Sequence, residues 1–251
     1  MAVYITGDLH RDFNRLKSFC YKNRTTLNDW IVCLGDVGVN FFGDKSDDIV
    51  KKKLTKLPIN LFCIRGNHEI RPEHVKGYES VSVQAAGGSP IISGVARWDA
   101  RYPNQFFACD GFSYQVMLED GKIFNALVVG GAYSIDKYYR LENGWPWFED
   151  EQLSVKEQTM ILDLVTTTIQ NPHERYDVVF SHSCPTRFVP TELFLKDVDQ
   201  SKVDNKTEAF LDRLYELFPK DKKPHWYFGH FHGNKYEDGY TMLYNDIVRL
   251  V

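Results

Sequence analysis

The sequence predicts an α/β fold, because strand-like and helix-like segments alternate through its first third. Short apolar segments at Val3–Thr6, Trp30–Leu34 and Ile59–Ile64 have the composition of buried strands. A stretch with helical spacing of apolar residues separates each segment from the next. Short apolar strands joined by helices pair in parallel, and ligand sites in such sheets lie at the carboxyl ends of the strands.

Two helices are expected to connect these three strands. Asp12 can cap the first helix, which places Phe13, Leu16 and Cys20 on one face. Ser46 can cap the second helix, which ends before Pro58 and has an apolar side formed by Ile49, Val50, Leu54 and Leu57.

The middle of the chain predicts an antiparallel or mixed sheet. Its strand-like segments, separated by turn residues, are Val81–Ala86, Ile91–Val95, Phe112–Leu118 and Ile123–Val129. Helices are expected at Asp150–Ile169 and Thr207–Phe218, and further strands at Asp177–Phe180, Trp226–Phe228 and Thr241–Val248. No internal repeat or linker interrupts this order, so we expect one domain spanning residues 1–251.

Composition excludes several classes of protein. With 14% aromatic residues, a chain of 251 residues is not disordered, and no run approaches the ~18 apolar residues needed to cross a bilayer. A total of 30 Lys and Arg against 34 Asp and Glu gives a net charge of −4, which does not support binding to nucleic acid but does not exclude it. No secretory signal is evident. The 5 cysteines form no Cys-x-x-Cys pair, so we expect reduced thiols and a cytoplasmic location.

Five strand-like segments end in residue types that bind metals. They are Asp8-Leu9-His10, Gly35-Asp36, Gly66-Asn67-His68-Glu69, Ser181-His182 and Gly229-His230-Phe231-His232. Each motif alone also fits a turn or a surface histidine, but together they contain 5 of the 8 histidines. Imidazoles, carboxylates and one amide without a thiolate suit manganese, iron, zinc or magnesium rather than an all-cysteine structural zinc site.

Seven candidate ligands are too many for one tetrahedral ion: Asp8, His10, Asp36, Asn67, His182, His230 and His232. They suit two divalent ions about 3.5–4 Å apart, with Asp36 as the natural bridge. Two such cations neutralise phosphate charge and lower the pKa of a bridging water, so that hydroxide can attack phosphorus in line. His68 is left over as the acid or transition-state donor for the leaving alkoxide. The alternative for His68 is a structural histidine.

These motifs, in this order, resemble those of the calcineurin-like metallophosphoesterases, in particular a bacterial or phage type. The family pattern of Asp-x-His, Gly-Asp, Gly-Asn-His-(Asp/Glu), a strand-end His and Gly-His-x-His appears between Asp8 and His232, which is almost the whole chain. The resemblance implies a four-layer α/β/β/α sandwich of two mixed β-sheets flanked by helices. It also implies two metal sites that share Asp36, one with Asp8, His10 and His232 and the other with Asn67, His182 and His230.

We therefore expect a phosphoesterase that depends on two divalent metal ions, with manganese as the first choice. It is expected to hydrolyse phosphomonoesters, phosphodiesters or both. The partner is a phosphorylated substrate of a class that the sequence does not name. The alternatives are a non-catalytic interaction scaffold with the same fold, a nuclease of the family, and a binding module with one structural metal. The presence of all seven candidate ligands favours the enzyme.

Other features qualify the resemblance. Arg11 follows Asp-x-His where many relatives have Gly, and the segment after Asp36 lacks the continuation typical of phosphoprotein Ser/Thr phosphatases. Arg11 and Arg65 are candidate phosphate-binding residues, with a structural role as the alternative. The aromatic segment Tyr133–Leu153 is expected to pack against the second sheet and start the following helix, the alternative being a wall or lid over the site.

Overall fold

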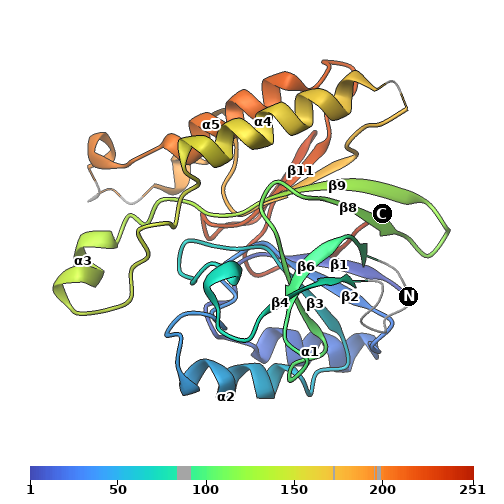
Figure 1. The fold of residues 1–251 in the computed structure, drawn as a ribbon, viewed down its shortest axis with the longest axis vertical. Helices are drawn as coiled ribbons and strands as arrows, with labels where there is room; N and C mark the ends of the chain where they lie inside the picture. The colour runs from blue at the N-terminus through green and yellow to red at the C-terminus, as the bar shows by residue number, and fades with distance from the viewer. Residues whose placement is uncertain (84–91, 172, 195, 197–198) are drawn as a thin grey trace.

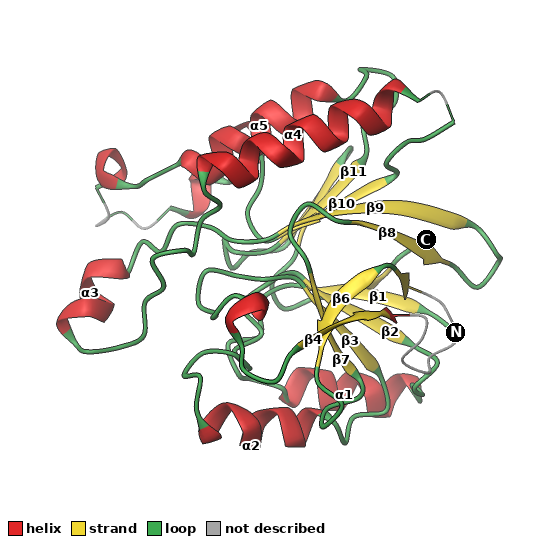
Figure 2. Ribbon diagram, viewed as in Figure 1, coloured by secondary structure: helices red, strands yellow, loops and turns green. Residues whose placement is uncertain are grey.

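Two seven-stranded sheets lie face to face between two layers of helices in a computed structural model (Figure 1). The structure describes residues 1–83, 92–171, 173–194, 196 and 199–251. From top to bottom in Figure 2 the layers are a helix pair, the second sheet, the first sheet and another helix pair. This arrangement is the four-layer α/β/β/α sandwich that the resemblance implied.

The first sheet has four parallel strands in its centre, β1, β2, β3 and β7, with antiparallel strands at both edges. Its strands, in spatial order, are β14 (Ile247–Arg249), β1 (Val3–Thr6), β2 (Trp30–Cys33), β3 (Asn60–Cys63), β7 (Gln105–Ala108), β6 (Val95–Trp98) and β4 (Glu79–Ser82).

The second sheet is also mixed, with β9, β10, β11 and β13 parallel and the remaining strands antiparallel. Its strands, in spatial order, are β12 (Lys235–Glu237), β13 (Tyr240–Met242), β11 (His225–Phe228), β10 (Val178–Ser181), β9 (Ile123–Val129), β8 (Ser113–Met117) and β5 (Ile92–Ser93).

Three apolar cores hold the four layers together. The central core lies between the sheets and includes Val32 and Phe180. A second core joins the first sheet to α1 and α2, and a third joins the second sheet to α4 and α5. The α-helices are α1 (Asn14–Asn23), α2 (Lys45–Leu54), α3 (Lys137–Glu142), α4 (Val155–Gln170) and α5 (Lys206–Leu217). Short 3-10 turns lie at Pro72–His74, Thr186–Phe188, Thr191–Leu193 and Gln200–Lys202.

The alternation of strands and helices in the first third is confirmed, but several predicted boundaries were wrong. Asp44 rather than Ser46 caps α2, because its carboxylate accepts the Ser46 N–H. The helix predicted from Asp150 begins at Val155, where Ser154 and Glu157 form a capping box. Strand β7 was not predicted, because its four residues are all buried and have no alternation.

Two segments predicted as single strands are divided between the sheets. Ile91–Val95 contributes β5 to the second sheet and β6 to the first, with Gly94 at the break. The left-handed backbone of Gly94, with φ +149°, permits this abrupt change. Thr241–Val248 is likewise divided between β13 and β14. Residue 91 and the end of the predicted Val81–Ala86 strand lie outside the described residues.

No helix in the described part of the chain is long and apolar enough to span a membrane. All five cysteines are buried and free, in agreement with the expected reduced thiols.

Candidate metal centre

The predicted ligand segments meet because they follow neighbouring parallel strands. Strands β1, β2 and β3 are adjacent in the first sheet, and β10 and β11 are adjacent in the second. Parallel strands present their carboxyl ends at one edge of a sheet, so the residues that follow them come together there. The convergence thus follows from strand order, and it joins residues as far apart in the chain as Asp8 and His232.

One group of donors is formed by Asp8, His10 and His232. The Nε2 atoms of His10 and His232 lie 2.9 Å apart. They are 3.4 Å and 3.2 Å, respectively, from the same oxygen, Asp8 Oδ2. That oxygen is buried and accepts no hydrogen bond within the described residues, while Asp8 Oδ1 accepts the backbone N–H of His230 at 2.8 Å.

A second group of donors surrounds His182. Its Nε2 atom lies 2.8 Å from Asn67 Oδ1, and its Nδ1 atom lies 2.7 Å from the carbonyl oxygen of Leu34. The His230 ring packs edge-on against the His182 ring, with centroids 5.0 Å apart.

Asp36 lies between the two groups. Its Oδ2 atom is 3.9 Å from His10 Nε2 and 3.5 Å from His182 Nε2. Its Oδ1 atom accepts the backbone N–H of His68 at 2.8 Å. A carboxylate in this position can offer an oxygen to both groups.

The backbone around these ligands is strained and closely packed. Five of the six non-glycine residues with a left-handed backbone in the described chain lie in or beside the motifs, namely His10, Arg11, Asp36, His230 and His232. The sixth, Arg24, ends α1. Such conformations cost about 1–3 kcal/mol each and concentrate at functional sites.

Glycines leave the space that the carboxylates occupy. A Cβ atom at Gly66 would lie 1.9 Å from Asp36 Oδ1, and one at Gly229 would lie 2.4 Å from Asp8 Oδ1. Neither distance is compatible with a side chain, which explains why both motifs begin with glycine.

The two carboxylates are held in their charged form. Burial raises the pKa of Asp8, but the facing imidazoles of His10 and His232 outweigh it and hold this pKa well below its ordinary value. Burial also raises the pKa of Asp36, but the charge of His182 and its hydrogen bond outweigh burial, so the pKa of Asp36 is lowered. Burial lowers the pKa of His182, but Asp36 and Asp8 outweigh it and raise the pKa to about 9. By contrast, burial and the charge of His182 lower the pKa of His230 to about 3.

The hydrogen-bonding roles at His182 show that a positive charge is needed there. The Leu34 carbonyl requires a proton on Nδ1 of His182. The Asn67 amide nitrogen donates to Ser134 Oγ at 2.8 Å, which turns its oxygen toward His182 Nε2. An unprotonated Nε2 and an amide oxygen are both acceptors, so a proton or a metal cation must lie between them. An imidazole that donates its other N–H to a backbone carbonyl is also the usual arrangement of a metal-binding histidine.

These donors fit divalent cations. Imidazole nitrogens, carboxylates and one amide oxygen converge, and three sets of carboxylates and imidazoles are each close enough to hold an ion: Asp8, His10 and His232; His10, Asp36 and His68; and Asp8, Asp36 and His182. The buried Asp8 Oδ2, which accepts no hydrogen bond from the described residues, supplies a further reason for a cation at this position.

His68 stands at the edge of the ligand cluster. Its ring packs edge-on against His10, with centroids 5.4 Å apart, and its Nε2 atom is 3.8 Å from Asp136 Oδ1. Burial lowers the pKa of His68, Asp36 opposes this shift and Arg140 adds to it. The imidazole is 25% exposed, so it can reach a molecule bound at the cluster.

The two arginines predicted as phosphate-binding residues are engaged elsewhere. Arg11 binds Asp47 at 3.1 Å and the Ser46 carbonyl at 3.2 Å. Arg65 is buried, and it donates to Asp110 at 3.0 Å and to the Glu151 carbonyl at 2.7 Å. The structural alternative therefore describes their contacts.

Sequence reasoning assigned no role to Glu69, although it quoted this residue as the last of its motif. The Glu69 carboxylate accepts the backbone N–H groups of Gly38 and Gly66, at 2.8 Å and 3.2 Å. It thereby ties the loop after β2 to the loop after β3. Burial and the charge of Asp36 raise its pKa to about 7.

Sequence reasoning also missed Ser134 and Glu151, which lie behind Asn67. Ser134 Oγ accepts from Asn67 and donates to Glu151 Oε2 at 2.5 Å. Glu151 also accepts the backbone N–H of Ser134 at 3.0 Å and the indole N–H of Trp147 at 2.9 Å. No local spacing marks this chain of contacts, because its first link joins residues 67 positions apart.

Residues 133–153, which we term the α3 lobe, contradict the expected packing of the aromatic segment against the second sheet. Tyr138, Tyr139 and Trp145 are 65%, 57% and 55% exposed. Figure 1 shows α3 projecting from the layered body. The lobe borders the candidate site through the contact between Asp136 and His68.

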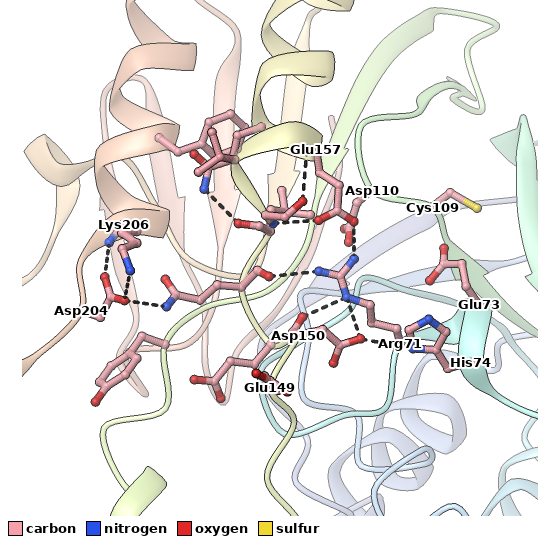
Figure 3. Close-up of a pocket in the computed structure, with 18 of the residues that line it drawn as sticks. Arg71, Glu73, His74, Cys109, Asp110, Glu149, Asp150, Glu157, Asp204 and Lys206 are labelled. Carbon is pink, nitrogen blue, oxygen red and sulfur yellow. Dashed lines mark hydrogen bonds and ion pairs between the residues drawn. The ribbon is translucent and has the colours of Figure 1, made fainter.

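A separate cavity of about 1480 Å³ is lined in part by the lobe, including Tyr133, Lys137 and Trp147. Figure 3 shows Arg71 at its centre, bound to Asp150 and Glu157. Its lining contains none of the seven predicted ligands.

Comparisons with known proteins agree with the motif pattern. The family model described as calcineurin-like phosphoesterase matches residues 1–234. A search of curated proteins finds no match. The solved structures that a structural comparison matches include the protein of unknown function AQ665 from Aquifex aeolicus, with 13% identity, a TM-score of 0.30 and coverage of 72% of this chain and 80% of that chain. Another is phosphopantetheinyl hydrolase (PptH) from Mycobacterium tuberculosis, with 12% identity, a TM-score of 0.38 and coverage of 97% and 88%. Both similarities are too weak to support a conclusion about activity.

Proposed function

Because the chain belongs to the calcineurin-like phosphoesterase family, a metal-dependent family of phosphoester hydrolases, we propose that it hydrolyses phosphate esters at a centre of two divalent cations. The observation that supports this most directly is the position of Asp36, whose Oδ2 atom lies between His10 and His182. One carboxylate that faces two donor groups is the arrangement that a pair of ions requires.

We assign one cation to Asp8, His10, Asp36 and His232, and the other to Asp36, Asn67, His182 and His230. Manganese is the first choice, since a mixed set of imidazole, carboxylate and amide donors suits it. When bound, two divalent cations neutralise phosphate charge and lower the pKa of water.

The chain's own residues position the substrate and the ligands. The left-handed turns at Asp36 and His230 hold their side chains close to the strand ends. His68 is partly exposed beside the cluster, and we assign it the hydrogen bond or proton that the leaving oxygen needs. The backbone N–H of His68 donates to Asp36 Oδ1, and this hydrogen bond keeps the loop that carries His68 beside the cluster.

The proposal is tested with colorimetric phosphomonoester and phosphodiester substrates, with Mn²⁺ and with chelator. Wild-type protein should turn over substrate only with metal, and Asp36→Asn and His68→Asn should each lower kcat by about 10²-fold or more. Asp36→Asn should also weaken Mn²⁺ binding in calorimetry, whereas His68→Asn should not. The matched control is His173→Asn, at an exposed histidine outside the motifs. Full activity of both site variants, or binding of fewer than two equivalents of Mn²⁺, would contradict the assignment.

A further inference from the structure

Arg140 is a buried cation with unused hydrogen-bond donors. Its side chain in α3 is only 1% exposed. Its Nη1 atom donates to Ser134 Oγ at 3.3 Å, and the same atom is 3.9 Å from Asp136 Oδ1. The Nε and Nη2 atoms are buried and have no hydrogen-bond partner within the residues that the structure describes. A guanidinium is always charged, and its burial is unfavourable unless an anion or an acceptor compensates it.

This cation lies beside the candidate metal centre. Ser134, which accepts from Arg140, also accepts from Asn67 at 2.8 Å. Asp136, on the other side of Arg140, is 3.8 Å from His68 Nε2. A single side chain therefore separates Arg140 from Asn67, and another separates it from His68. Arg140 lowers the pKa of His68; burial lowers the pKa of Arg140 itself, which the charges of Asp136, Glu151 and Asp36 oppose.

Asp136 forms an ion pair with Arg140 at 3.9 Å but accepts no hydrogen bond from it. Its Oδ1 atom is buried without a hydrogen bond, although His68 and Arg140 lie on either side of it. Both distances exceed the length of a hydrogen bond. The Arg140 guanidinium thus lies one side chain away from the imidazole to which we assigned the leaving oxygen.

The α3 lobe that carries Arg140 is attached firmly to the first sheet's side of the site. Arg65 donates to the Glu151 carbonyl at 2.7 Å, and Arg71 donates to the carbonyls of Asp150 and Gln152 at 2.9 Å and 3.0 Å. Figure 3 shows Arg71 beside Asp150. Arg65, the arginine of the motif itself, is engaged by Asp110 and the Glu151 carbonyl, whereas the Nε and Nη2 atoms of Arg140 have no hydrogen-bond partner among the described residues.

We propose that Arg140 binds a phosphoryl oxygen of the substrate and favours phosphomonoesters over phosphodiesters. This inference rests on the proposed phosphoesterase function. A guanidinium presents two adjacent N–H groups that match the oxygens of a phosphate. A phosphomonoester has three non-esterified oxygens and a phosphodiester has two. A monoester therefore has one more oxygen that can bind the Arg140 guanidinium while the others face the metal centre.

The experiment compares Arg140→Gln and Arg140→Lys with wild type in the Mn²⁺-loaded protein. Binding of inorganic phosphate is measured by calorimetry, and KM and kcat are measured with p-nitrophenyl phosphate and bis(p-nitrophenyl) phosphate. Loss of a charge-assisted hydrogen bond should weaken phosphate binding by about 10–100-fold in Arg140→Gln. KM should rise similarly for the monoester and much less for the diester. Arg140→Lys should be intermediate, because it keeps the charge but loses the fork.

Two controls separate binding from folding. Mn²⁺ affinity should be unchanged in both variants, and Arg101→Gln, at an exposed guanidinium that pairs with Asp99, should keep wild-type phosphate binding and kinetics. Unchanged phosphate affinity, or equal losses for both esters, would overturn the inference, as would a parallel loss of Mn²⁺ affinity. If Arg140→Gln does not fold, the same criteria apply to Arg140→Lys. A wild-type protein without turnover would overturn the proposed function as well, whereas turnover that is insensitive to Arg140 would overturn this inference alone.

Discussion

Replacing Ser134 with alanine tests whether residues behind Asn67 orient its amide toward the cations. The Ser134 hydroxyl accepts from Asn67 at 2.8 Å, donates to Glu151 at 2.5 Å and accepts from Arg140 at 3.3 Å. Without this hydroxyl the Asn67 side-chain amide can rotate, and nothing then fixes its oxygen toward His182.

The magnitude follows from the bonds that are lost. Asn67 Nδ2 would become a buried donor without its partner, which costs about 1–3 kcal/mol. Glu151 would keep its hydrogen bonds from the Trp147 indole and the Ser134 backbone N–H, so the free-energy cost at its carboxylate should be smaller. We expect a fall of about 2–4 kcal/mol in the free energy of unfolding. Mn²⁺ affinity should fall by about 10–100-fold, as for other residues that orient a metal ligand.

Calorimetric Mn²⁺ titration and urea unfolding of the metal-free protein measure the two effects. Tyr114→Phe is the matched control, because it removes a hydroxyl from a residue that is 1% exposed and lies in the central core. That hydroxyl accepts the Cys109 N–H at 2.8 Å and donates to the Val95 carbonyl at 2.6 Å. Both variants should be less stable, but only Ser134→Ala should bind Mn²⁺ more weakly. A folded Ser134→Ala protein with wild-type Mn²⁺ affinity would refute the reasoning.

Three further predictions concern space, burial and metal binding. Gly66→Ala should abolish Mn²⁺ binding and lower Tm, because its Cβ would lie 1.9 Å from Asp36 Oδ1. The control is Gly144→Ala, whose Cβ would meet nothing within 4 Å; it should change only the stability, by about 1–2 kcal/mol. Wild-type Mn²⁺ binding by the Gly66→Ala protein would disprove the packing argument. Burial raises the pKa of Glu208, so the folded state loses stability as pH rises through the unfolded pKa toward the folded one. Glu208→Gln should therefore stabilise the protein at pH 7 but not at pH 4 in denaturant unfolding, and equal effects at both pH values would count against it. Mn²⁺ at 100 times Kd should stabilise the folded state by about 2.7 kcal/mol, measured as a rise in Tm that EDTA reverses, and no rise would argue against a folded-state metal site.

The order of elements was predictable wherever the chain alternates clearly between apolar strands and helices. Strand β9 has the predicted bounds of Ile123–Val129. Strand β7 was missed because burial on both faces leaves no period of two. The division of Thr241–Val248 between two sheets was also missed, since composition alone does not reveal which sheet receives a strand.

The aromatic lobe shows why residue type does not determine packing. Tyrosine and tryptophan have the apolar area of core residues and also a polar tip, so both packed and exposed arrangements satisfy them. The structure buries Arg140 and exposes Tyr138 and Tyr139 within the same short helix. The prediction from composition was wrong on this point.

By itself, the sequence determined which donors follow which strands, because an apolar strand, a glycine and a metal-binding residue stand next to one another in the chain. Only the tertiary structure decided which arginine is hydrogen-bonded to other residues and which keeps donors without a hydrogen-bond partner among the described residues. Arg65 finds Asp110 and Glu151 at separations of 45 and 86 residues, and Asn67 finds Ser134 at 67. Hydrogen bonds over such separations depend on how the two sheets and the lobe pack, and local spacing carries no record of that packing.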